Sequence, residues 1–176
     1  MRIFSRMDKS EMGPVNLQEG LQATLTLVKA KYKEDVDFIT DFQPSLEVQG
    51  NQAELNQVFM NIIKNACQAI IEKQKSSVES ARGTLTIKTV TQNDEVMIIF
   101  QDTGKGIPAK VKEKMFEPFF TTRADGEGTG LGLSVSFGII KKHQGRIEVE
   151  SEEGKGATIT LFLPKAITPA ETTARR

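Results

Sequence analysis

Apolar side chains recur at helical spacing in three stretches of the chain. The first stretch follows Asn16, a favourable N-cap residue, and predicts a helix of roughly four turns. The second covers residues 51–73 and begins with a sequence close to a capping box, and the third covers residues 131–142. A short helix is also predicted in residues 109–116. The chain is therefore expected to have about three main helices.

Shorter stretches have the pattern of β-strands. Residues 36–42 alternate between apolar and polar side chains, and residues 46–50 look like a short strand that pairs with them. Two hairpins are predicted, one from residues 84–90 and 95–102 and the other from residues 146–151 and 157–164. Because hairpins make antiparallel pairs and the strands alternate with helices only in part, we predict an α+β fold. This fold is a two-layer α/β sandwich, in which a mixed, mostly antiparallel sheet of about five strands packs on about three helices.

Composition and charge limit the classes of function. The chain has 176 residues, of which 38% are hydrophobic, enough for one domain with a sizeable core. Lys and Arg number 23 and Asp and Glu also number 23, so no overall field attracts nucleic acid or an anionic membrane. The single cysteine, Cys67, excludes an internal disulfide framework, and no apolar run is long enough to span a membrane. We expect a monomeric, cytoplasmic domain without direct contact to nucleic acid or membrane, although a longer parent protein could be membrane-anchored.

The second predicted helix has a polar stripe beside its apolar face. On a helical wheel, the stripe consists of Glu54, Gln57, Asn61, Asn65 and Gln68. A solvated face would favour Lys and Glu, which are better helix formers than Asn. Because Asn61 and Asn65 lie one turn apart, their side-chain oxygens can share a water molecule or a hard cation such as Mg²⁺. The alternative is that these amides only cap and solvate the helix.

A carboxylate stands at the end of the most apolar predicted strand. The run Val96–Phe100 is apolar on both alternations, which favours a central strand, and Asp102 follows it. An ionised carboxylate only accepts hydrogen bonds, so it can accept from the exocyclic amine of adenine and disfavour guanine. Gly104 and Gly106 would let the backbone approach a flat ring or turn sharply. The alternative is an ordinary glycine-containing turn.

Four glycines alternate with other residues just before the third predicted helix, in the sequence DGEGTGLGLS. The unpaired amides and the positive dipole at such a helix start suit a phosphate group. The spacing matches neither a P-loop nor a dinucleotide-binding fingerprint. The preceding residues, 117–129, have no periodicity and suggest a mobile lid, and Arg123 is the nearest cation for a terminal phosphate. The alternative is a flexible surface loop.

Four segments, NQVFMNIIKNACQAI, DTGKGIP, FEPFFTTR and GEGTGLGLS, resemble in order and spacing the N, G1, F and G2 boxes of sensor histidine kinases. The resemblance covers roughly residues 36–164, the whole catalytic and ATP-binding domain of the GHKL superfamily, and is greatest to the nitrogen-regulation type. It implies that the chain binds ATP or ADP together with Mg²⁺. It also implies that the chain has three parts. Residues 1–15 would be the end of a missing dimerisation and phosphoacceptor helix with its linker, residues 16–165 the catalytic domain, and residues 166–176 a disordered tail.

The resemblance assigns roles to individual residues. It implies that Asn65 ligates Mg²⁺, that Asn61 supports the metal or its water, and that Arg123 joins them in catalysis. It implies that Asp102 contacts adenine beside Gly104, Gly106 and Ile107. Further nucleotide contacts are implied for Phe120, Thr121, Gly128, Thr129, Gly130, Leu131, Gly132 and, through water, Thr158. Gln68 stands where many relatives have a phosphate-contacting lysine, which leaves more of the charge to Arg123 or to a neighbouring domain.

The implied reaction is transfer of the γ-phosphoryl group of ATP to a histidine on a separate two-helix domain, followed by signalling to a response regulator receiver domain. His143, the one histidine of the chain, lacks the acidic neighbour and downstream proline of such an acceptor and is interpreted as a helix-end residue. Three alternatives remain: a free-standing anti-sigma-type serine kinase, a GHKL hydrolase module, and a degenerate nucleotide-binding scaffold. The hydrolase is disfavoured because such enzymes normally have a glutamate where Asn61 stands.

Overall fold

The computed structural model describes residues 12–44, 46–76, 81–120 and 130–166. Its main sheet has five strands in the order β2-β4-β5-β7-β6. The strands are β2 (Val36–Asp41), β4 (Gly83–Gln92), β5 (Glu95–Asp102), β6 (Arg146–Glu152) and β7 (Gly156–Pro164). β2 pairs with β4 in parallel and the other neighbours pair antiparallel, so the predicted mixed sheet and both predicted hairpins are confirmed. β5 lies in the centre, as its apolar sequence predicts.

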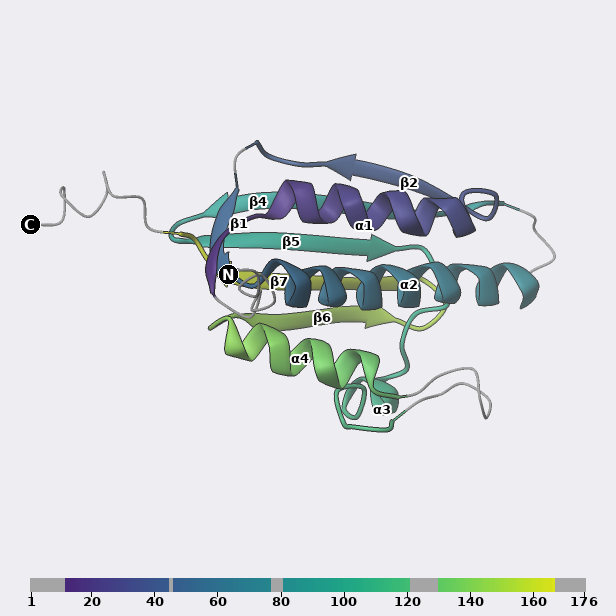
Figure 1. Ribbon diagram of the computed structural model, residues 1–176. Coiled ribbons are helices and arrows are strands. Elements are labelled where there is room, and N and C mark those ends of the chain that lie inside the picture. Colours follow the sequence, from purple (N-terminus) through teal and green to yellow (C-terminus); the bar gives the residue numbers. More distant parts are fainter. Residues whose placement is uncertain (1–11, 45, 77–80, 121–129, 167–176) are drawn as a thin grey trace, which may run out of the picture.

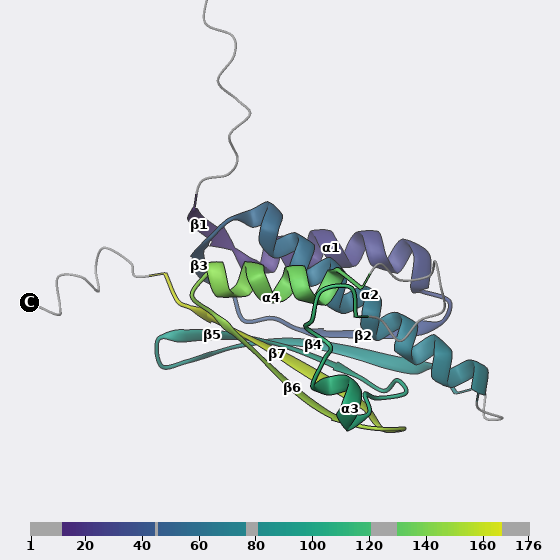
Figure 2. The ribbon, with the colours of Figure 1, turned by 90° about the horizontal axis from the view of Figure 1, so that it is seen from below.

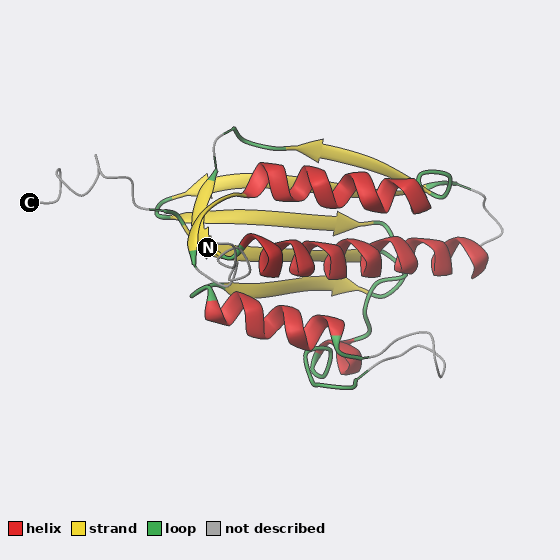
Figure 3. Ribbon diagram, in the orientation of Figure 1, coloured by secondary structure: helices red, strands yellow, loops and turns green. Residues whose placement is uncertain are grey.

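Three main helices cover one face of this sheet. They are α1 (Leu17–Tyr32), α2 (Gln52–Ser76) and α4 (Gly132–Lys142), and Figures 1 and 3 show them side by side over the strands. In the view of Figure 2 these helices form one layer and the sheet forms the other, and none of the three lies on the sheet's far face. The short α3 (Ala109–Lys112) lies near the start of α4. The two-layer α+β architecture is therefore confirmed.

A second, two-stranded sheet corrects one predicted pairing. Residues 46–50 were expected to pair with residues 36–42, but β3 (Glu47–Gly50) pairs antiparallel with β1 (Gly13–Asn16). β1 falls in the segment that the resemblance assigns to a linker. Three of the four residues in its sequence, GPVN, are of types depleted in strands, so it carries little local strand signal. Pairing choice here depends on tertiary contacts, which residue periodicity does not contain.

The core lies between α1 and α2 and the inner face of the sheet. The predicted apolar face of α2 is buried throughout, and it consists of Leu55, Val58, Phe59, Ile62, Ile63, Ala66 and Ile70. Phe59 packs on Phe100 of β5, with ring centroids 6.4 Å apart. Because the apolar face is buried, the polar stripe of the same helix is held at a fixed orientation relative to the end of β5.

The helix starts also agree with prediction, with one difference. The side chain of Asn16 accepts hydrogen bonds from the backbone N–H groups of Gln18 and Glu19. At α2, the side chain of Asn51 accepts from the N–H of Glu54, which is one half of a capping box. The other half is replaced, because the N–H of Asn51 donates to a histidine ring instead of to Glu54.

Candidate nucleotide-binding site

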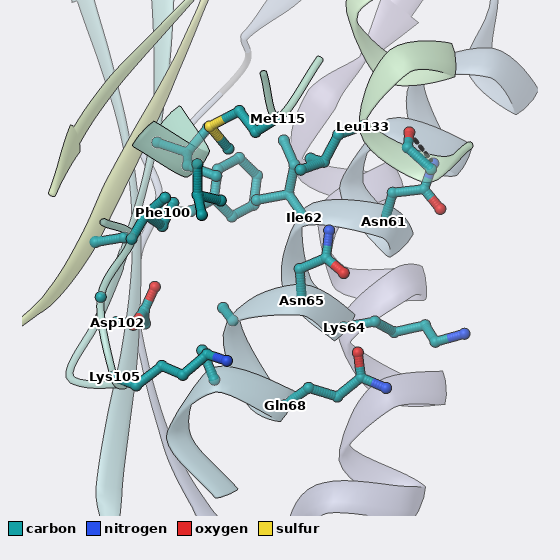
Figure 4. A pocket seen from close by; sticks show the side chains of 18 of the residues that line it. Asn61, Ile62, Lys64, Asn65, Gln68, Phe100, Asp102, Lys105, Met115 and Leu133 are labelled. Carbon is teal, nitrogen blue, oxygen red and sulfur yellow. Dashed lines mark hydrogen bonds between the residues drawn. The ribbon is translucent and has the colours of Figure 1, made fainter. Parts of the chain in front are cut away.

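A cavity of about 520 Å³ opens between α2, the ends of β5 and β7, and the start of α4. Figure 4 shows side chains from these elements pointing toward it. Its walls include the predicted site residues Asn61, Asn65, Asp102, Gly106, Ile107, Phe120, Gly130 and Gly132. The volume is within the usual range for small-molecule pockets, and much of the lining is apolar. The structure thus brings together residues from segments that are far apart in the sequence.

Asp102 forms a buried polar point in this cavity. It ends β5, is only 8% exposed, and accepts a hydrogen bond from the N–H of Gly104 at 2.8 Å. Burial raises the pKa of Asp102 above its ordinary value, while hydrogen bonds from the backbone of Gly104 and Ala157 and the charge of Lys73 lower it. The same cavity is also lined by the apolar side chains of Ile62, Phe100, Met115 and Ile159. A carboxyl group among apolar walls suits a flat, polar-edged ring such as a purine.

The amide stripe of α2 forms the opposite wall. Asn61, Asn65 and Gln68 all line the cavity, and Figure 4 shows them one above another along the helix. The amide nitrogen of Asn61 donates to the carbonyl of Gly132 at 2.9 Å and to the hydroxyl of Ser136 at 3.2 Å. Since its nitrogen is engaged by α4, the oxygen of Asn61 is the atom left to face a ligand.

Gly104 and Gly106 have a structural role that sequence analysis did not identify. A Cβ atom at Gly104 would lie 2.7 Å from the backbone carbon of Ala69. Gly106 has φ of +71°, and a Cβ there would lie 2.1 Å from the backbone oxygen of Glu152. Both glycines therefore let this loop pack closely against other backbone segments, α2 on one side and the β6–β7 turn on the other. Gly106 also lines the cavity.

The start of α4 faces the same cavity. Gly130 has φ of +66°, and a Cβ there would lie 2.5 Å from the backbone of Phe119. Gly132 lines the cavity beside Asn61, whereas the side chain of Leu131, the N-cap residue, is exposed and does not line it. The start of a helix is a favourable place for an anion, because its first amides have no partner within the helix and its dipole is positive there. Thr121, Arg123, Gly128 and Thr129 lie outside the described residues.

The predicted contact of Thr158 is not supported by its position. Ala157 and Ile159 of β7 line the cavity, so the alternation of strand side chains directs Thr158 to the opposite face of the sheet. There it borders a separate hollow with Gln101 and Glu150. On β7 the position that faces the cavity beside Asp102 is 157, where the chain has alanine, and Ala157 pairs with Asp102 across the sheet.

Two lysines in the cavity wall were missed by sequence analysis. Lys64 precedes Asn65, and Lys105 lies in the DTGKGIP segment, where its amino group pairs with Glu72 of α2 at 2.5 Å. Both lysines stand inside predicted motifs, but neither has a motif position that marks it as a ligand. The charge of Lys105 is balanced by Glu72, which lines the cavity as well.

The described ranges contain no cluster of three or more His, Cys, Asp or Glu side chains that could hold a metal ion. None of the helices in the same ranges combines the length and the apolar character that a membrane crossing requires.

Fold and cavity together define a class of protein: a two-layer α/β nucleotide-binding domain of the GHKL type. The family model of the histidine kinase-, DNA gyrase B- and HSP90-like ATPases matches residues 50–167. The chain therefore belongs to this family.

Within this family, the chain is similar to histidine kinases. The chain is 42% identical over 164 residues to the signal transduction histidine-protein kinase AtoS of Escherichia coli, covering 92% of this chain and 25% of AtoS. The catalytic domain of histidine kinase ThkA superposes with a TM-score of 0.74 at 30% identity, covering 88% of this chain and 96% of that domain. ThkA in complex with response regulator protein TrrA is similar as well, with a TM-score of 0.70, 27% identity and coverage of 88% and 42%.

These comparisons show that the chain is the ATP-binding catalytic domain of a histidine kinase. It spans about a quarter or less of the length of the first curated relatives it matches. The remaining length of those proteins has no counterpart in the 176 residues.

Proposed function

We propose that this domain binds Mg·ATP and donates the γ-phosphoryl group to a histidine on a separate dimerisation and phosphoacceptor domain. The observation that carries the proposal is the convergence of Asp102, Asn65 and the start of α4 on one cavity. In this assignment Asp102 accepts from the adenine amine, with Gly104, Gly106 and Ile107 beside it. The amides of Gly130, Leu131 and Gly132 hold the phosphates, together with the predicted contacts from Phe120, Thr121, Arg123, Gly128 and Thr129.

The donor set fits Mg²⁺ only in combination with nucleotide. Mg²⁺ prefers oxygen ligands in octahedral geometry and usually retains several waters. Asn65 would supply an amide oxygen, and Asn61 would supply a second one or orient a metal-bound water, because its nitrogen is already engaged by α4. Mg²⁺, when bound, neutralises charge on the phosphates. Without a carboxylate cluster in the described ranges, the protein alone should bind Mg²⁺ weakly.

The residues favour phosphoryl transfer over hydrolysis. A general base for water must accept a proton, which an amide cannot do, and Asn61 stands one turn before Asn65. Transfer needs positioning and charge stabilisation rather than a base on this domain. In the transfer step, a neutral imidazole nitrogen of the acceptor forms the new P–N bond with its lone pair. The bond between the γ-phosphorus and the bridging oxygen breaks, and ADP leaves.

The acceptor histidine must lie outside this chain. His143 is the one histidine in the sequence, it is 2% exposed, and both of its ring nitrogens make hydrogen bonds to backbone groups. A residue held in this way cannot reach the γ-phosphorus. Residues 1–15 would then be the end of the acceptor domain and its linker, and residues 166–176 a tail, with the catalytic domain between them.

Further partners follow from the surface and from the relatives. Phe119 is 75% exposed, and Leu131 and Val135 are each 37% exposed at the start of α4, so an apolar surface lies next to the cavity opening. We propose this surface as the contact to the acceptor domain. ThkA forms a complex with a response regulator, and we propose such a receiver domain as the downstream partner. We also propose the nitrogen-regulation subtype, a cytoplasmic location and a monomeric isolated domain.

Calorimetry of Mg·ADP binding tests the site. Asn65→Ala and Asp102→Ala should each weaken binding at least tenfold, which is about 1.4 kcal/mol. Adding labelled ATP and a separately prepared histidine domain should label that domain on histidine. Undiminished affinity in both variants would remove the site assignment, and labelling of serine in an added substrate would favour the anti-sigma-type alternative.

A further inference from the structure

His143 joins the two helices that form the proposed site. It is the C-cap residue of α4, and its side chain is buried between α4 and the start of α2. Its Nε2 atom accepts a hydrogen bond from the backbone N–H of Asn51 at 2.9 Å, and its Nδ1 atom lies 2.7 Å from the carbonyl oxygen of Ile139. Carbonyl oxygens only accept, so the proton of the ring is on Nδ1. The two bonds together require the neutral Nδ1–H tautomer.

The partner of this ring is the residue that begins α2. Asn51 caps α2 with its side chain, while its backbone N–H goes to His143. In a full capping box that N–H would be satisfied by Glu54. The carboxylate of Glu54 instead pairs with Lys142 of α4 at 2.6 Å. Two neighbouring residues at the end of α4 thus take over contacts at the start of α2.

The same two helices are joined again at the other end of α4. There the amide of Asn61 donates to Gly132 and Ser136. Figure 1 shows α2 and α4 running side by side in opposite directions, which agrees with these pairs. α4 has 11 residues and is about 16 Å long, so the two hydrogen-bonded points are roughly that distance apart. Two separated points fix both the translation and the tilt of one helix on another, whereas Asn61 alone would act as a pivot.

The imidazole ring of His143 is closely packed against Gly50. A Cβ atom at Gly50, the residue before Asn51, would lie 2.8 Å from Cδ2 and 3.0 Å from Nε2 of His143. Gly50 ends β3, so this contact also ties α4 to the small β1–β3 sheet. Any larger residue at position 50 would displace the ring from Asn51.

We propose that His143 is a positioning residue: by holding the end of α4 to the N-cap of α2, it places the phosphate-binding start of α4 opposite Asn61 and Asn65. The inference rests on the proposed function, because it assigns the nucleotide phosphates to that end of α4. Its consequence is that a change about 16 Å from the phosphates weakens nucleotide binding. The binding-competent arrangement is then populated only in part, which raises the apparent Kd in proportion.

A matched pair of substitutions tests the inference. A glutamine side chain reaches about as far as Nε2 and can accept from Asn51, whereas an asparagine side chain reaches only as far as Nδ1. We expect His143→Asn to weaken Mg·ADP binding about tenfold and His143→Gln to stay within about twofold of wild type. Gly50→Ala should weaken binding as His143→Asn does, and Lys141→Gln, an exposed change on the same helix, should have no effect. If His143→Asn does not fold, the Mg·ADP affinity of Gly50→Ala is compared with that of His143→Gln instead.

A spectroscopic measurement on the untagged chain keeps the two proposals separable. With one histidine in the sequence, the ¹⁵N spectrum contains a single imidazole, and we expect Nδ1 to be pyrrole-like and Nε2 pyridine-like. An Nε2–H tautomer, or wild-type affinity in both His143→Asn and Gly50→Ala, would overturn the inference while leaving the site assignment intact. Failure of Asn65→Ala and Asp102→Ala to weaken binding would remove the proposed function, and the inference with it.

Discussion

Gly106 and Gly154 provide a direct test of why the loop after β5 contains glycine. Both residues have left-handed backbone conformations, with φ of +71° and +81°. They lie on the two sides of one contact, in which the N–H of Gly154 donates to the carbonyl of Lys105. Their surroundings differ, since a Cβ at Gly106 would lie 2.1 Å from a backbone oxygen, whereas a Cβ at Gly154 would meet nothing within 4 Å.

The magnitudes follow from this difference. An alanine in the left-handed region costs about 1–2 kcal/mol, and this cost applies to both positions. Only Gly106→Ala must also displace the backbone of Glu152, and overpacking of this kind costs about 1–3 kcal/mol more. For a domain of this size that extra cost is about 2–12 °C in Tm. We therefore expect Gly106→Ala to melt about 2–12 °C below Gly154→Ala in the absence of nucleotide.

The assay is thermal unfolding of the two variants and wild type, followed by circular dichroism without ligand. If Gly106 were needed only for close approach of a nucleotide ring, the two variants would melt at the same temperature. Equal Tm values would thus refute the packing argument. A lower Tm for Gly106→Ala together with weakened Mg·ADP binding would show that the loop must be packed before it can form the cavity wall.

Three further outcomes follow from the site. Burial raises the pKa of Asp102 above its ordinary value of 3.8, so ionising this carboxyl group lowers the stability of the fold: full stability is present below that pH and is lost as the pH rises through the folded-state pKa. Asp102→Asn has no charge to bury, so it should raise Tm at pH 7 but little at pH 4. The same variant should weaken Mg·ADP binding. Burial raises the pKa of Cys67 to about 12, so the thiol should resist alkylation in the native protein at pH 8 and react once the chain is unfolded; rapid native labelling would contradict its buried position. Thr158→Val should leave Mg·ADP affinity unchanged in calorimetry, since the side chain points away from the cavity, and a loss of affinity would reinstate the predicted water-mediated contact.

The parts of the fold that depend on local periodicity could be predicted from the sequence. The buried face of α2, the central position of β5 and the two hairpins are all encoded in residue spacing. The pairing of β1 with β3 could not be predicted, because three of the four residues in GPVN are of types depleted in strands and its partner is more than thirty residues away. The same limit applies to the capping box of α2, where the expected partner of Asn51 is replaced by His143 from a distant helix.

In the site, the motifs predicted which residues meet, and the role of each residue stays a prediction. Asn61, Asn65 and Asp102 all line one cavity, as predicted. The placement of Thr158 differs because strand alternation reverses the direction of a side chain with every residue, so a motif aligned one position off selects the wrong face. The loop glycines illustrate a second limit, since their sequence indicates close approach but does not say whether a ligand or another backbone segment approaches.

Asn61 shows how the proposed chemistry depends on this assembly. As an isolated amide on a helix it could present either its oxygen or its nitrogen to a ligand. In the folded domain its nitrogen donates to Gly132 and Ser136, so its oxygen is the atom left for a ligand. The hydrogen bonds that join α4 to α2 therefore also orient the amide that we assign to Mg²⁺. The position of α4 and the binding of Mg²⁺ are thus coupled through the side chain of Asn61. For this reason a substitution at His143 is expected to weaken nucleotide binding.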